Sequence, residues 1–234
     1  ANDTQADGLT HSSIWCIVKD NQGTLWLGTY FGGVNYFNPE YEIYTRYSYS
    51  SNEKKGLSNP VVGRTIEDKD GNLWIGTEGG GLNYYNRRTR EFKWYRPQEG
   101  RNSISHNNVK ALYYDADKEI IWIGTHLGGL NKLDIRSGHF THYRMEEGNP
   151  NTLPSDIIRD IIPYKSLLII ATQNGVCLFD PANGQCQQLF KDSKEGKSIK
   201  MVADVTFDSE GTLWIAATGE GVLSLIHISE PTRR

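Results

Sequence analysis

Residues 68–83 read DKDGNLWIGTEGGGLN, and this pattern is found in five copies along the chain. Its centre, NLWIGT at 72–77, has counterparts in TLWLGT at 24–29, IIWIGT at 120–125, LIIAT at 168–172 and TLWIAA at 212–217. The slot of the central tryptophan holds Trp26, Trp74, Trp122, Ile169 and Trp214, at spacings of 48, 48, 47 and 45 residues. A period of this length is typical of folds in which every repeat forms one small structural unit.

The rest of the unit repeats in phase with the tryptophan. An apolar run ending in an acidic turn precedes it, as in VGRTIEDKDG, and an aspartate three residues before a glycine predicts a short hairpin loop. A Gly-Gly-led run such as GGLNYYNR and an aromatic run such as EFKWYR follow it. Four short antiparallel strands in about 47 residues predict one blade of a β-propeller. A β-sandwich would not require the same tryptophan at a fixed period, so we expect the tryptophans to pack between blades.

The chain is therefore expected to be all-β, an incomplete propeller of four blades plus half a fifth within residues 1–222. The expected blades are 14–57, 58–104, 105–153 and 154–199, with a partial blade at 200–222 that has two strands and then loses the pattern. Because residues 2–13 match a loop between blades, we expect the parent protein to be longer at both ends. The last residues, LSLIHISEPTRR at 223–234, resemble a translated sequencing adapter and are expected to be a non-native tail; the alternative is a genuine variant strand and tail.

Composition agrees with this fold and excludes several classes of protein. The 234 residues include 24 glycines, 13 tyrosines and 6 tryptophans, a mixture that favours strands joined by tight turns. No stretch approaches 18 consecutive apolar residues, so no membrane span is expected. The net charge of −3 is spread along the chain without a basic stripe, so a nucleic-acid partner is not expected.

Motifs for catalysis or metal binding are missing from the sequence. It has no HExxH or CxxC spacing for a metal, no GxSxG elbow and no phosphate-binding loop. Glycines 79–81 recur as 32–33 and 128–129, where they open the third strand, so a backbone turn explains them. We therefore expect no catalytic residue, metal site or cofactor in this chain.

Ligand recognition is expected on one face of the propeller, where the loops after the second strands meet the loops that lead into the next blade. Residues that vary within otherwise regular slots are candidates for recognition on such a face. Aromatic rings beside amides, imidazoles and a carboxylate suit a sugar, because its apolar face stacks while its hydroxyls form hydrogen bonds. The candidates are Tyr30, Phe31, Glu78, His126 and Gln173 after the second strands, and His11, Asn59 and His106 before the first strands.

The cysteines give one further expectation. Cys177 and Cys186 flank the hairpin LFDPANGQ, and a four-residue loop at 180–183 would pair them directly across two strands. Both stand in columns that hold other residue types in the remaining blades, which favours a pair. In an oxidising periplasm we expect a cross-strand disulfide, whereas in the cytosol both would remain thiols. Cys16 lies among apolar neighbours and is expected to be a buried thiol.

The pattern DxxGxLWIGTxxGGLN resembles the two-component regulator propeller repeat. Residues 68–83 match that repeat almost letter for letter, the units around Trp26 and Trp122 match closely, and the last two are degenerate. The resemblance implies the periplasmic sensor region of a hybrid two-component histidine kinase, followed in the parent by further blades, a Y_Y_Y domain, a membrane helix and kinase domains. It also implies a glycan-derived small molecule as ligand and a homodimer as the full-length state. This fragment has no kinase motif, so it is expected to sense but not to phosphorylate.

Two other functions remain open from the sequence. A secreted propeller enzyme, similar to virginiamycin B lyase, would need a base such as His11, His106 or His126 and usually a metal. No acidic partner for them is expected in a matching slot of an adjacent blade. A protein-binding scaffold similar to WD-repeat proteins is the third alternative, although the Trp-Asp dipeptide is missing.

Overall fold

The structure, a computed structural model, describes residues 9–38, 43–190 and 199–225. Within these residues five antiparallel sheets follow one another along the chain, four of four strands and one of three. The first three sheets contain β1 (Ile14–Lys19), β2 (Leu25–Thr29), β3 (Val34–Asn38) and β4 (Ile43–Tyr47); β5 (Val62–Glu67), β6 (Leu73–Thr77), β7 (Gly81–Asn86) and β8 (Glu91–Tyr95); β9 (Val109–Asp115), β10 (Ile120–Thr125), β11 (Leu130–Asp134) and β12 (His139–Tyr143). The last two contain β13 (Ile158–Tyr164), β14 (Leu167–Thr172), β15 (Gly175–Phe179) and β16 (Cys186–Gln188); β17 (Val202–Phe207), β18 (Leu213–Ala217) and β19 (Gly221–Leu225).

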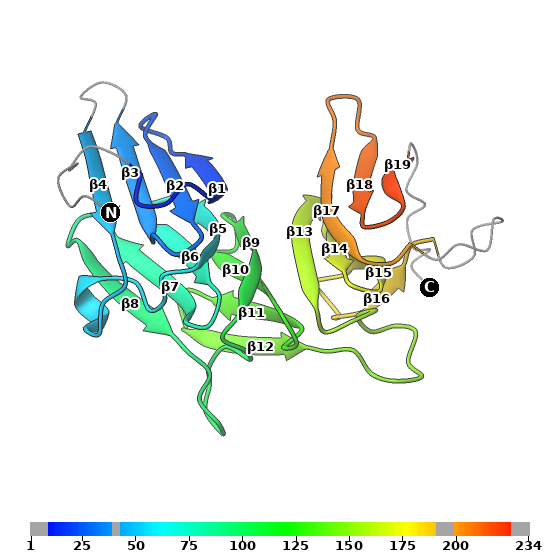
Figure 1. Cartoon of the computed structure of the whole chain (residues 1–234). Helices are drawn as coiled ribbons and strands as arrows, with labels where there is room; N and C mark the ends of the chain where they lie inside the picture. Colours follow the sequence, from blue (N-terminus) through cyan, green and yellow to red (C-terminus); the bar gives the residue numbers. More distant parts are fainter. Residues whose placement is uncertain (1–8, 39–42, 191–198, 226–234) are drawn as a thin grey trace.

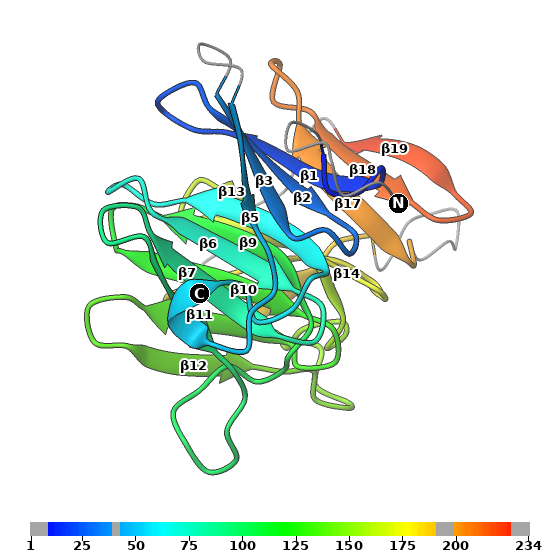
Figure 2. The same cartoon turned by 60° about the vertical axis from the view of Figure 1, so that its left-hand side comes forward.

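The sheets are the blades of a β-propeller, which confirms the predicted fold. In every sheet the strands lie in sequence order, so each blade is an antiparallel meander. The first strands β1, β5, β9, β13 and β17 lie toward the common centre, and the last strands lie outside (Figure 1). Neighbouring first strands contact one another from β1 to β17, and the view in Figure 2 shows the blades turning around that centre. One turn of 3₁₀-helix, Glu53–Lys55, interrupts the connection between the first two blades.

The fifth blade differs from its prediction. It has three strands, and the third, β19, runs beyond Val222 to Leu225. Leu225 pairs with Leu213, and Leu223 and Leu225 both pack against the core between the fourth and fifth blades. Residues 223–225, which the sequence assigned to a non-native tail, therefore form part of a strand because their alternating apolar side chains meet an apolar surface. The remainder of that expected tail, 226–234, lies outside the described residues.

A recurrent turn fixes the register of the first two strands in a blade. In the second blade, Asp68 Oδ1 accepts hydrogen bonds from the backbone N–H groups of Asp70 and Asn72, at 3.0 and 2.9 Å. Its Oδ2 accepts the indole N–H of Trp74 at 3.1 Å. Gly71 has φ 77°, a left-handed conformation that glycine adopts without strain. The same carboxylate bridges turn and indole at Asp20 and Asp208, so the DxxGxLW pattern encodes a closed turn.

The tryptophans lie in the cores between blades. Trp74, 2% exposed, points from the second blade toward the third, while Leu73 and Ile75 on either side of it point back toward the first. Trp26 and Trp122 are buried in the same way. The second and third blades thus present an indole forward and aliphatic side chains backward, whereas the fourth blade has Ile169 in the forward position. Trp214 holds the same position in the fifth blade but is 40% exposed, because none of the described residues forms a further blade against its forward face.

The hairpin of Cys177 and Cys186 has a different register from the one expected. Cys186 pairs with Phe179 and Cys177 with Gln188, because residues 180–185 form a longer loop. Asp180 closes that loop: its backbone N–H donates to the carbonyl of Gln185, and its own carbonyl accepts from Gly184. The two cysteines are diagonal neighbours in one buried cluster, and both are free thiols rather than a disulfide.

Candidate ligand-binding face

The loops at one end of the blades are held together by a repeated backbone contact. The residue after each Gly-Thr or equivalent pair donates its backbone N–H to a carbonyl in the loop before the first strand of its own blade. The donors are Tyr30, Glu78, His126 and Gln173, with distances of 3.1, 3.0, 2.9 and 3.0 Å. This contact brings the two sets of predicted recognition residues to the same face, as the sequence predicted.

The residues before the first strands have a structural role that the sequence analysis missed. Nδ1 of His11 accepts the backbone N–H of Ser13 at 3.0 Å, and Nδ1 of His106 accepts that of Asn108 at 3.1 Å. Asn59 makes the equivalent bond to Val61 with its side-chain oxygen. Each of these side chains closes a local turn by accepting the backbone N–H of the residue two positions later, as polar side chains often do in turns. Each histidine keeps only its Nε2 for a ligand.

Four aromatic rings form a cluster on the first blade. Trp15 stacks on Tyr30 with 4.9 Å between ring centroids and 16° between planes. Tyr30 meets Phe31 edge to face at 4.3 Å, and the ring of His11 lies 6.4 Å from each of these two rings. Trp15 is 50% exposed and Phe31 58% exposed. Rings that are packed yet exposed offer a rigid apolar surface of the kind on which sugar rings stack.

A cation joins this cluster to the second and third blades. Lys110, on β9, forms an ion pair with Glu78 of the second blade, and its ammonium lies 5.7 Å from the ring of Trp15. The sequence analysis selected neither Trp15 nor Lys110. A sequence signal for them exists: one column of the first strands carries a long side chain in the middle of an apolar run. This column holds Trp15, Lys110 and Arg159, and the strand forms a bulge at each of them.

The two imidazoles at the middle of the face are shifted toward their neutral forms. Burial, and then the charges of Arg159 and Lys110, lower the pKa of His126. Burial and then Arg144 lower the pKa of His106. The buried Nδ1 of His126 has no hydrogen-bond partner among the described residues. Because Nδ1 of His106 already accepts a backbone hydrogen bond, a neutral His106 offers its Nε2–H as a donor, which suits a hydroxyl group.

The structure therefore brings only some of the predicted recognition residues into contact with one another. His11, Tyr30 and Phe31 touch, and Glu78 lies close enough to His126 to act on its charge. No hydrogen bond or ring contact joins the side chains of Asn59 and Gln173 to this group among the described residues. The face therefore has an aromatic half on the first blade and a charged half on the second and third.

Deeper in the centre lies an acidic pair that the sequence analysis did not select. Asp160 and Asp204 occupy matching positions in adjacent blades, each opposite an alanine of its second strand. Nη2 of Arg64 lies 2.8 Å from Asp160 and 3.9 Å from Asp204. Burial, followed by the hydrogen bond with Asp204, raises the pKa of Asp160 to about 6. This acidic pair faces Arg64 and is not the partner of a histidine that the lyase alternative would need. Sequence reasoning missed the pair because it followed histidines instead of the column opposite the Gly-Thr strand.

Among the described residues, no group of three or more His, Cys, Asp or Glu side chains is arranged to hold a metal ion. No helix in that part of the chain has the length and apolar character needed to span a lipid bilayer.

Three repeats of the chain match a protein-family model. The model of the two component regulator propeller matches residues 8–31, 56–79 and 103–126. Each match runs from the loop before a first strand to the residues after Gly-Thr, and so contains one blade's share of the candidate ligand-binding face. No curated protein sequence matches the chain.

Solved structures show the same fold. The extracellular domain of BT3049, named as a hybrid two component system of B. thetaiotaomicron, has a TM-score of 0.77 and 25% identity over 92% of this chain and 29% of its own. The extracellular domain of BT4673 from B. thetaiotaomicron has a TM-score of 0.73 and 23% identity over 93% of this chain and 31% of its own. PorZ of Porphyromonas gingivalis, a component of the type-IX secretion system, has a TM-score of 0.69 and 18% identity over 96% and 34%. The chain therefore spans about a third or less of the length of these proteins.

Proposed function

We propose, from the match of three repeats to the two component regulator propeller, that this chain is part of the periplasmic, ligand-sensing propeller of a hybrid two-component histidine kinase. The proposed ligand is an oligosaccharide. The observation that carries this proposal is the cluster of Trp15, Tyr30 and Phe31 beside the Lys110–Glu78 ion pair. Packed rings supply a stacking surface, and the charged and imidazole groups supply hydrogen bonds at its border.

The proposed mechanism is differential binding. A ligand shifts an equilibrium only when it binds one arrangement of the receptor more tightly than another. The ligand-binding face joins three blades through Lys110, so a bound sugar would contact loops from several repeats together. In the full-length dimer such a contact would favour one arrangement of the neighbouring domains, and the kinase would report that shift.

A binding experiment tests the proposal. Neutral oligosaccharides released from plant and host glycans are titrated into the 234-residue chain by calorimetry. The variant Trp15→Ala removes a ring that is 50% exposed on the proposed face, and Trp214→Ala, which removes one that is 40% exposed elsewhere, is the matched control. We expect a ligand whose affinity falls at least about tenfold in Trp15→Ala, as for loss of one stacked ring, and is unchanged in Trp214→Ala. Equal affinities of the wild type and Trp15→Ala would refute the proposed face.

A further inference from the structure

The first and fifth blades leave open the two halves of one kind of interface. Each blade has a forward face toward the next blade along the chain and a backward face toward the preceding one, and Figure 1 shows these two blades at the ends of the row. Among the described residues, no blade lies behind the first or ahead of the fifth. The residues on both open faces can therefore be compared with their counterparts at the closed interfaces.

The forward face of the fifth blade exposes side chains that are buried in the other blades. Val222 is 66% exposed, whereas its counterparts in the other third strands are at most 1% exposed and lie in the cores between blades. These counterparts are Val34, Leu82, Leu130 and Val176. Trp214 shares this face with Val222 and is the exposed member of its own column. The fifth blade thus presents an apolar surface that every other blade has covered.

The backward face of the first blade is open in the same way. Ile17 is 61% exposed, whereas its counterparts in the other first strands are 2–5% exposed: Thr65, Leu112, Ile161 and Val205. Leu25 and Leu27, on either side of Trp26, are half-buried, although the residues in their columns are buried in the next four blades. A forward face packed against this surface would bury all three aliphatic side chains.

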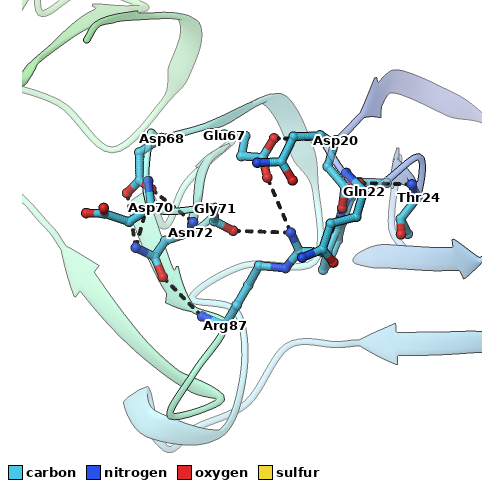
Figure 3. A network of polar contacts seen from close by, with 11 residues as sticks. Asp20, Gln22, Thr24, Glu67, Asp68, Asp70, Gly71, Asn72 and Arg87 are labelled. Carbon is cyan, nitrogen blue, oxygen red and sulfur yellow. Dashed lines mark hydrogen bonds and ion pairs between the residues drawn. The ribbon is translucent and has the colours of Figure 1, made fainter. Parts of the chain in front are cut away.

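Opposite charges meet at the edge of the closed interfaces between the first three blades. Nη2 of Arg87, in the second blade, lies 2.6 Å from Asp20 of the first, and Figure 3 shows its guanidinium beside the turn of Asp20. At the next interface, Lys69 of the second blade forms an ion pair with Glu119 of the third. Both pairs lie at the turns that join first to second strands, so this edge brings charges of opposite sign together across blades.

The two open faces carry opposite charges at the same edge. On the fifth blade, Asp208 and Glu210 lie in the turn that corresponds to the turn of Asp20. On the first blade, Lys19 stands in the column of Glu67, whose carboxylate reaches the turn of the preceding blade. Within the described part of the chain, none of Lys19, Asp208 and Glu210 forms an ion pair. The two faces are therefore complementary in charge as well as in apolar character.

We propose that two copies of this chain bind head to tail, with the forward face of the fifth blade of one copy on the backward face of the first blade of the other. Trp214 and Val222 of one copy cover Ile17 of the other, and Lys19 meets Asp208 at the edge. Because two different surfaces form this contact, each copy keeps one free face, and further copies add in a row. The inference does not rest on the proposed sensing function and can hold if that function fails.

Sedimentation velocity over a concentration series tests the proposal on the 234-residue chain. We expect species larger than a dimer that grow with concentration, and a monomer at every concentration would overturn the proposal. Ile17→Lys charges the backward face and Trp214→Lys the forward face, so each variant alone should be monomeric. A 1:1 mixture of the two variants should associate again but stop at a dimer, because one variant supplies the only intact forward face and the other the only intact backward face.

The mixture separates this contact from other modes of association. Dimers of Ile17→Lys alone would show that forward faces bind each other, and a mixture that stays monomeric would show that the two faces are not partners; either result would overturn the proposal. Val222→Lys repeats the forward-face test while it leaves the hydrogen bond from Trp214 to Asp208 in place. Met145→Lys is the matched control, since it adds the same charge at a side chain that is 45% exposed in the loop between the third and fourth blades. Its association should equal that of the wild type, and an equal loss would refute the two faces.

The charges at the edge test the direction of the contact. Lys19→Glu places a like charge against Asp208 and Glu210 and should weaken association at least about threefold, as for one ion pair at the border of an interface. Glu210→Lys in the same chain should restore most of the lost affinity. Equal association of the wild type and Lys19→Glu would overturn the pairing of these two faces.

Discussion

The equivalent tryptophans of the second and fifth blades offer a controlled test of how the propeller is stabilised. Trp74 and Trp214 occupy the same repeat position, and each donates its indole N–H to the aspartate of its turn, at 3.1 and 2.7 Å. They differ in the blade that follows: Trp74 is 2% exposed and Trp214 is 40% exposed. Replacing each by alanine removes the same hydrogen bond, so the difference between the two variants measures packing between blades.

The expected magnitudes follow from burial. Truncation of a fully buried tryptophan costs about 3–5 kcal/mol, which includes the cavity that remains. Trp214→Ala leaves no enclosed cavity and removes a smaller buried area, so we expect about 1–2 kcal/mol. The difference in the free energy of unfolding should therefore be about 2 kcal/mol or more.

Urea denaturation followed by far-ultraviolet circular dichroism measures both variants. The midpoint should fall much further for Trp74→Ala than for Trp214→Ala, with similar slopes against urea. Trp74→Phe is the control, because it keeps an aromatic ring in the cavity and should retain part of the lost stability. Equal destabilisation by the two alanine variants would show that the turn hydrogen bond, and not packing between blades, gives the tryptophan its role.

Four further outcomes follow from the structure. Burial alone would raise the pKa of Asp20, but the hydrogen bonds from Trp26 and Thr24, together with Arg87, hold it below its usual range. The stability that the ionised Asp20 contributes to the fold is therefore present above about pH 4 and is lost as the pH falls further. Asp20→Asn should therefore lower stability at pH 7 by about 1–3 kcal/mol and flatten the acid limb of a plot of melting temperature against pH. Asp160 has the opposite effect on stability, because its pKa is raised to about 6. The protonated Asp160 stabilises the fold at low pH, and this stability is lost as the pH rises from about 4 to 6. Asp160→Asn should abolish that decline in the same plot. Because Cys186 is a free thiol, a reductant should leave the melting temperature unchanged, and a marked drop would indicate a disulfide. The exposed forward face at Trp214 should drive self-association, so sedimentation velocity should show a larger monomer fraction for Trp214→Lys than for the wild type.

Most of the fold could be predicted from the sequence because each blade repeats the same local chemistry. The aspartate, glycine and tryptophan of DxxGxLW form one closed turn, so their spacing reports strand register directly. The prediction failed where the pattern is degenerate. The cysteine hairpin closes through Asp180 and Gly184 in a longer loop, and β19 continues to Leu225 on apolar alternation alone.

The candidate site was less predictable, because its residues meet across blades. The sequence analysis selected Tyr30 and Phe31, whose rings touch. Lys110 reaches the ring of Trp15, which stacks on Tyr30, from a strand about 95 residues further along the chain, and no local pattern encodes that contact. The histidines were chosen for their chemistry, yet the Nδ1 atoms of His11 and His106 serve their own turns. A sequence shows which side chains are polar but not which of their atoms are already engaged.

The six tryptophans of the chain allow the central claim to be tested directly. Each indole N–H gives its own signal in a nitrogen-15 nuclear magnetic resonance spectrum, and single Trp→Phe variants assign them. During titration with a neutral oligosaccharide that binds, we predict that the signal of Trp15 moves, while those of Trp26, buried between blades, and Trp214, on the forward face, stay in place. Movement of Trp214 without Trp15, or binding that leaves Trp15 unchanged, would contradict a sugar-binding face at the loops of the first three blades.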